Sequence, residues 1–182
     1  MYFVSDSALT GSERNAQGEE ARAGQPNMYV LHEGATKLVS VLSSADSPDW
    51  GHNGYLKAGG NVVDPGTAVL GLTARVSPDG EWLAFVSRRQ LTGYDNLDVG
   101  SGRPDAEVYV YHASAGTLVC ASCDPTGARP RGAARVPGWT MPLYQSRYLS
   151  DGGRLFFDSP DALVAQDTND AEDVYELSLI HI

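Results

Sequence analysis

The chain has 182 residues, of which 42% are hydrophobic and 20% are charged, so it is long enough for one or two globular domains. Acidic residues outnumber basic residues by 23 to 13, which gives a formal net charge of −10 without any cluster of Lys or Arg. This charge argues against a nucleic-acid partner, since phosphate binding needs a concentrated basic surface. No apolar run approaches the length of a membrane span, and the first residues do not form a signal-peptide pattern.

Short blocks of sequence recur along the chain in a consistent order. Phe3–Ser5 recurs as Phe85–Ser87, and Met28–His32 matches Val108–His112. A third copy runs from Arg147 through Ser159 and continues with Asp173–Tyr175. The spacing between matched blocks varies where loops tolerate insertion. The chain is therefore expected to be a repeat protein.

Each block predicts a β-strand, because it is short and rich in aromatic and β-branched residues. Trp82–Ser87 and Arg154–Ser159 also each follow a turn that contains Gly. Ser77-Pro78-Asp79-Gly80 suits a type I turn, with Pro at its second position and Gly at its fourth. No stretch has helical periodicity of useful length, so the expected fold class is all-β, with four antiparallel strands in a full repeat. The strands expected from the second repeat onward are Ala74–Val76, Trp82–Ser87, Val108–Tyr111, Thr117–Cys120 and Arg154–Ser159.

The turn at Ser77–Gly80 with the strand Leu83–Ser87, and the strand Glu107–Tyr111, resemble the TolB-type repeats, which are relatives of WD repeats. Val164–Tyr175 also resembles exported bacterial members of that family. The resemblance implies β-propeller blades, each a four-stranded antiparallel sheet. Because the family carries six or more blades, it implies a partial propeller of about two and a half blades with long loops, a fragment of a larger exported protein.

The repeats divide the chain into three blades and two long inter-blade loops. Blade 1 is expected to lack its first strand, and blade 3 is expected to be incomplete. The tail after Glu176 contains no Gly, Asp or Asn to form a turn, so it is either a non-native extension or a short terminal strand. The expected boundaries are 1–44, 73–122 and 146–182 for the blades, and 45–72 and 123–145 for the loops.

The motifs of known catalytic sites do not occur in the sequence: it lacks a nucleophile elbow, a zinc-protease motif, a P-loop and a dinucleotide-binding fingerprint. His32 and His112 occupy equivalent strand ends in two repeats, which favours a structural role because an active site is normally unique. His52 lies in a long loop, and spacing reveals no catalytic partner for it. We therefore expect this segment not to be an enzyme.

Cys120 and Cys123 form a C-x-x-C pair followed by the turn Asp124–Gly127. A thioredoxin-like role requires a βαβ setting, which is missing, and a zinc site needs a further ligand pair, which does not follow at the usual spacing. Two interpretations remain: a short disulfide, or two free thiols. Export would favour oxidation to the disulfide.

Three oxygen-bearing residues, Asp167, Asn169 and Asp173, lie within seven positions. Oxygen donors at alternating positions are typical of calcium ligands, so this segment is a candidate calcium site. The segment lacks the Gly and Glu that complete an EF-hand loop, and Asx residues also form turns. Calcium is the one cofactor that the sequence suggests.

Four aromatic residues lie in the inter-blade loops and are candidate binding anchors. The alternative is that they cap the apolar layers between blades, since blades pack with large flat side chains. They are Trp50, Tyr55, Trp139 and Tyr144.

Two functions from different classes fit these features. The first is a non-catalytic propeller scaffold that binds a protein or ligand in the cell envelope, the periplasm or outside the cell. The second is a propeller domain that gates substrate access to a larger serine peptidase or hydrolase. The first is favoured because every recognisable block belongs to a blade, and the expected partners are a protein or peptide and the remaining blades of the same parent chain.

Overall fold

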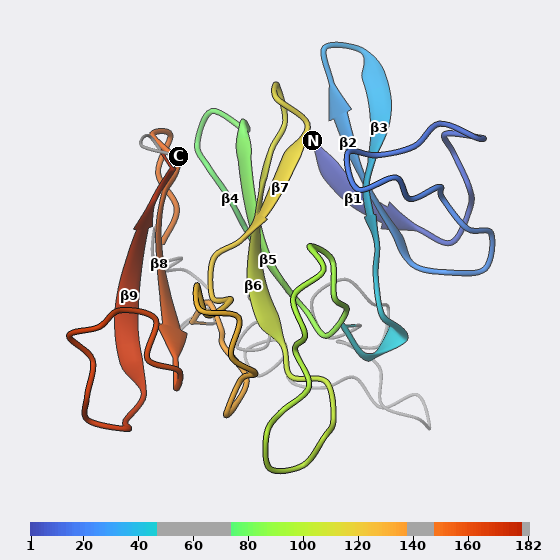
Figure 1. Ribbon diagram of the computed structural model, residues 1–182. Helices are drawn as coiled ribbons and strands as arrows, with labels where there is room; N and C mark the ends of the chain where they lie inside the picture. The colour runs from blue at the N-terminus through green and yellow to red at the C-terminus, as the bar shows by residue number, and fades with distance from the viewer. Residues whose placement is uncertain (47–73, 138–147, 180–182) are drawn as a thin grey trace, which may run out of the picture.

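The computed structural model describes residues 1–46, 74–137 and 148–179, and the regular secondary structure in this part of the chain is almost entirely antiparallel β-strand (Figure 1). Three sheets follow one another along the chain: the first contains β1–β3, the second β4–β7, and the third β8 and β9. The expected all-β fold class is confirmed. The elements are β1 Tyr2–Ser5, β2 Asn27–His32, β3 Ala35–Val41, the short 3-10 helix η1 Ser44–Asp46, β4 Arg75–Val76, β5 Trp82–Ser87, β6 Glu107–His112, β7 Thr117–Cys120, β8 Arg154–Ser159 and β9 Asp173–Ser178.

The second sheet is a complete four-stranded meander in the order β4-β5-β6-β7. Its first turn is the expected one: the Gly80 N–H donates to the Ser77 carbonyl at 2.9 Å, and Gly80 has a φ of 81°, which glycine adopts without strain. The Ser77 hydroxyl donates to the Asp79 carboxylate and receives the Trp82 N–H, so the turn is closed by side chains as well. The predicted repeat of four antiparallel strands is confirmed in this sheet.

The first sheet has the order β1-β2-β3, which corresponds to the last three strands of the second sheet. Glu33 and Gly34 join β2 to β3, and both have positive φ, 49° and 78°. That backbone matches the twist of a tight two-residue hairpin. Met28 and Tyr29 lie at a register shift in β2.

The third sheet pairs β8 with β9, from Arg154 opposite Ser178 to Ser159 opposite Asp173. An isolated bridge joins Leu149 to Leu155, and the Phe156 N–H donates to the Tyr148 carbonyl at 2.8 Å. The segment around Leu149 therefore takes the place that β4 has in the second sheet.

The second sheet packs between the other two, using opposite faces (Figure 1). Successive residues of a strand point to opposite faces, so Phe85 contributes to one core and Ala84 to the other. The part of the chain that the structure describes does not close a ring. The core with the first sheet contains Met28, Val30, Val39, Leu42, Leu83, Phe85, Leu91, Tyr109, Tyr111, Ala113 and Leu118. The core with the third sheet contains Ala84, Val108, Val110, Ala134, Val136, Leu149, Leu155 and Phe157.

All three sheets contain one repeated interaction motif. In each, a Phe lies directly opposite a Tyr on the next strand, and the tyrosine hydroxyl is held by the loop that joins the two strands. The phenylalanine begins the string Phe-x-Ser-x-x-x-Leu in each repeat. The tyrosine hydroxyl donates to a carbonyl within this string and accepts the backbone N–H of its leucine. The hydroxyl of its serine accepts another N–H of the loop, at 3.1 Å in all three repeats. In the order phenylalanine, tyrosine, carbonyl acceptor and leucine donor, the sets are Phe3, Tyr29, Ser7 and Leu9; Phe85, Tyr109, Arg89 and Leu91; and Phe157, Tyr175, Asp161 and Leu163.

Tyr109→Phe, which removes only the hydroxyl, is expected to lower the free energy of unfolding by about 1–2 kcal/mol, because two buried hydrogen bonds are lost. Tyr29→Phe removes the same pair of bonds, and Tyr175→Phe removes that pair together with the hydrogen bond to the Asp167 carboxylate, so both are expected to act in the same direction. Urea denaturation of the three variants measures this, with Tyr148→Phe as a control, since the Tyr148 hydroxyl makes no such contact in the described structure. A change in one variant alone would contradict the equivalence of the three motifs.

Polar contacts also fasten the first sheet to the second. The buried Asp46 carboxylate accepts the Ser87 hydroxyl at 2.6 Å and the Arg88 N–H at 2.9 Å. Arg89 donates to the Val41 carbonyl and forms an ion pair with Glu19 at 2.8 Å. These contacts bring the loop that follows β1 beside the loop that follows β5.

Candidate functional site

The first two long loops, 6–26 and 88–106, together with Leu118 of β7, line an open hollow of about 500 Å³. Glu19 lines this hollow, and both of its carboxylate oxygens have partners. One pairs with Arg89, and the other accepts the Ser40 hydroxyl and the Val41 N–H. Gln17 and Gln90 face the hollow from opposite loops, and both are exposed. The lining residues are Gln17, Glu19, Gln90, Leu91, Thr92, Gly93 and Leu118.

Asparagine side chains hold the backbone of these loops in place. The Asn15 side chain accepts the N–H groups of Gln17 and Glu19 and donates to the Val39 carbonyl. Asn96, fully buried, donates to the carbonyls of Arg88 and Asp105. The walls of the hollow are therefore fixed by internal hydrogen bonds. Gln17 and Gln90 are exposed, and the Gln90 amide N–H donates to the Asp95 carboxylate at 3.4 Å.

The third long loop, 160–172, contains two of the three candidate calcium ligands, Asp167 and Asn169. The Asp167 carboxylate accepts the Tyr175 hydroxyl and the Asn169 N–H, and the Asn169 side-chain oxygen accepts the Ala171 N–H at 2.8 Å. Asp173 begins β9 and has one buried carboxylate oxygen without a protein hydrogen-bond partner. The contacts of Asp167 and Asn169 are those of Asx turns, and calcium binding by these three residues stays a prediction.

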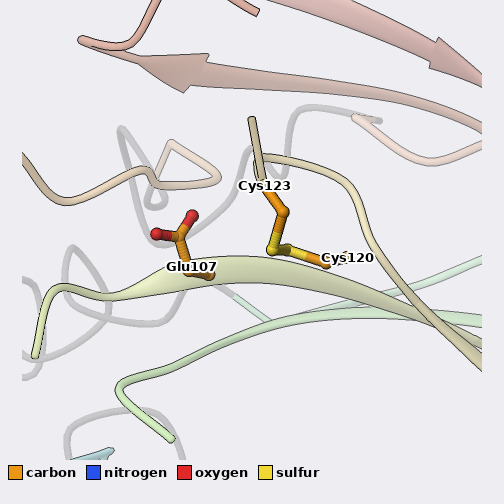
Figure 2. A group of neighbouring side chains, drawn as sticks. All are labelled: Glu107, Cys120 and Cys123. Carbon is orange, nitrogen blue, oxygen red and sulfur yellow. A yellow bond between two sulfur atoms is a disulfide. The ribbon is translucent and has the colours of Figure 1, made fainter. Parts of the chain in front are cut away.

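A second cluster surrounds the C-x-x-C pair, where Cys120 at the end of β7 and Cys123 in the following turn form a disulfide (Figure 2). The side chain of Glu107, the first residue of β6, stands beside the disulfide (Figure 2). One carboxylate oxygen of Glu107 and the two sulfurs all lie within 4.8 Å of one another. The Ser122 hydroxyl donates to Glu107 Oε2 and accepts the Val108 N–H at 2.8 Å, which fixes the carboxylate beside the disulfide.

Glu107 is fully buried, and its Oε1 atom has no hydrogen-bond partner. Burial raises the pKa of Glu107 to about 8, against the hydrogen bond from Ser122, and the negative charges of Asp161 and Asp105 add to the increase. Burial also raises the pKa values of Asp161 and Asp105. The Glu107 carboxyl group, at the start of β6, therefore retains its proton near neutral pH.

The double variant Cys120→Ser/Cys123→Ser is expected to lower the free energy of unfolding by about 2 kcal/mol, because a loop of so few residues loses little chain entropy when it is closed. Guanidinium denaturation of this variant and of the oxidised wild type measures the difference. A loss above about 4 kcal/mol would show that the disulfide holds more of the fold than its own turn.

His32 and His112 meet at one carboxylate between the first two sheets. Glu81 lies 3.6 Å from His32 Nε2 and 3.8 Å from His112 Nε2, and it also accepts the Ser114 hydroxyl. The Trp82 ring stacks on His112 at 4.0 Å between centroids. The Ser114 hydroxyl lies 3.4 Å from His32 Nε2, the same nitrogen that faces Glu81, whereas a Ser-His-acid triad binds acid and nucleophile at opposite nitrogens of the ring. The geometry joins two sheets and agrees with the structural role expected for these histidines.

The four candidate aromatic anchors, Trp50, Tyr55, Trp139 and Tyr144, all lie outside the described residues, as do His52 and His181. Their expected role as binding anchors stays a prediction. The structure adds two residues to the candidate sites, Glu107 beside the disulfide and Glu81 between the two histidines. No catalytic or metal-binding motif in the sequence includes them. The signal that could have found the hydroxyl-to-loop contacts was the string Phe-x-Ser-x-x-x-Leu, present in all three repeats.

No helix among the described residues is long and apolar enough to cross a bilayer. Comparison with models of protein families, with curated proteins and with solved structures finds no match. The function is therefore argued from the geometry of the loops and clusters described above.

Proposed function

We propose that the three sheets are successive blades of a TolB-type β-propeller, and that the chain is a non-catalytic scaffold that binds a protein or peptide through its long loops. The support is the repeated Phe–Tyr motif together with the packing of the second sheet, which contacts its two neighbours through opposite faces. Blades around a propeller axis pack in this way. On this proposal, the remaining blades belong to the same parent chain.

The observation that carries the binding function is the hollow between loops 6–26 and 88–106. A glutamine amide offers both a donor and an acceptor, which are the two groups that a peptide backbone presents. Gln17 and Gln90 place such amides on opposite sides of one hollow whose walls are fixed. A peptide segment lying between them can pair with both without reorganising the loops, which limits the entropic cost of binding.

The disulfide supports placement in the cell envelope or outside the cell, because disulfides persist mainly in oxidising compartments.

The test is a selection of linear peptides from a random library on the immobilised chain, followed by fluorescence anisotropy with the selected peptides. Gln17→Ala/Gln90→Ala is expected to weaken their binding at least tenfold. Gln166→Ala, which changes an equally exposed glutamine on the third loop, is the matched control and is expected to leave binding unchanged. A selection that yields no binding peptide, or peptides indifferent to the double variant, would contradict the proposal.

A further inference from the structure

The C-x-x-C pair has a third potential metal ligand that its sequence spacing does not reveal. Among the residues that the structure describes, Glu107, Cys120 and Cys123 are the one group of three or more His, Cys, Asp or Glu residues whose donor atoms all lie within 4.8 Å of one another. The register of β6 against β7, with Tyr109 opposite Cys120, brings Glu107 beside the two cysteines. Two thiolates and a carboxylate are a donor set that Zn²⁺ accepts.

An independent observation points to a ligand at this cluster. Glu107 Oε1 is buried and has no hydrogen-bond partner, although such an atom is costly to leave unpaired. Its other oxygen is held by Ser122, which lies between the two cysteines in sequence and also accepts a backbone N–H of β6. This is the arrangement of an oriented metal ligand, in which an outer hydrogen bond fixes one carboxylate oxygen and leaves the second available.

We propose that reduced Cys120 and Cys123, together with Glu107, form a zinc site, so that this turn is closed either by the disulfide or by a metal ion. A thiol reductant supplies two electrons and two protons, the S–S bond breaks, two protein thiols form, and the reductant becomes its own disulfide. Zn²⁺ then displaces the two thiol protons and the Glu107 proton to solvent and binds two sulfurs and one oxygen. The half-buried cysteines leave the fourth position open to water.

The experiment uses the full chain, reduced with excess thiol and then transferred without oxygen into thiol-free buffer. Co²⁺ is titrated first, because a thiolate-to-cobalt charge-transfer band and strong tetrahedral d–d bands report the ligand set directly. Zn²⁺ affinity is then measured by competition with a chromogenic chelator. The reduced wild type is expected to bind one ion with the thiolate band, and the oxidised wild type is expected to show no such band.

Glu107→Gln keeps the shape of the side chain and is expected to weaken Zn²⁺ binding at least tenfold, and Ser122→Ala is expected to weaken it by about tenfold because the carboxylate loses its orientation. Glu13→Gln, an exposed carboxylate on the first loop, is the matched control and is expected to bind as the wild type does. Circular dichroism of each reduced variant shows whether it is folded. Binding by the reduced wild type that is no tighter than that of Cys120→Ser/Cys123→Ser, or full affinity in folded Glu107→Gln, would overturn the proposal.

Discussion

Replacing Phe85 with alanine is expected to lower the free energy of unfolding by about 3–5 kcal/mol. The Phe85 side chain is fully buried between the first two sheets, and its ring lies 5.8 Å from that of Tyr109. Its removal leaves a cavity at the junction of two sheets, where neither backbone can collapse to fill it. Since a domain of this size has a total stability of about 5–15 kcal/mol, thermal denaturation should show a large decrease in Tm.

Phe156→Ala is the matched control for this change. Phe156 lies one position before Phe157, the third-repeat counterpart of Phe85, and points to the opposite face of its sheet, where it is 37% exposed. Its removal is expected to cost about 1 kcal/mol or less. Equal losses in the two variants would contradict the packing of the second sheet against the first.

Glu107→Gln is expected to make the oxidised protein more stable at pH 8 and to leave its stability near pH 4 almost unchanged. In the wild type, the unfolded chain loses the Glu107 proton near pH 4.5, whereas the folded chain retains it up to about pH 8. Between these values the unfolded state binds fewer protons, so the free energy of unfolding falls as pH rises, by about 1.4 kcal/mol per pH unit. Glutamine does not titrate, and the variant lacks this part of the loss.

Urea denaturation at half-unit steps from pH 4 to pH 8.5 measures both profiles. Asp105 and Asp161 also have raised pKa values, so they too lower the free energy of unfolding as pH rises. Both residues are present in the wild type and in the variant, and their contribution therefore cancels when the two free energies of unfolding are subtracted. The difference between the two proteins should grow to a few kcal/mol at pH 8. Parallel profiles would mean that Glu107 is ionised in the folded protein.

The strands could be predicted because their signals are local. Trp82–Ser87, Thr117–Cys120 and Arg154–Ser159 each combine β-branched or aromatic residues with a Gly-containing turn, and all three have the predicted bounds. The turn at Ser77–Gly80 could also be predicted from the sequence, since Pro and Gly favour the backbone conformation of such a turn at these positions. The order of strands in the second sheet followed from their spacing.

The contacts between elements could not be predicted in the same way. Glu107 meets the disulfide because β6 pairs with β7 in one register, and a strand sequence does not state which residue of its neighbour lies opposite. Glu81 receives both histidines because two sheets pack face to face, which depends on the apolar faces of each sheet as a whole. The string Phe-x-Ser-x-x-x-Leu is recognisable in the sequence as a repeat. Only the fold shows that each tyrosine hydroxyl forms hydrogen bonds with the backbone of the loop before its own strand.

The most direct test of the stacked-repeat architecture is a set of methyl-to-aromatic NOEs in solution. The structure predicts NOEs from methyl groups of β2, in Met28 and Val30, to the rings on β5 and β6, in Phe85 and Tyr109. It also predicts NOEs from Val108 and Val110 to the ring of Phe157 in the third sheet. NOEs confined within each sheet, with none between sheets, would contradict the face-to-face stacking of successive repeats on which the proposed scaffold rests.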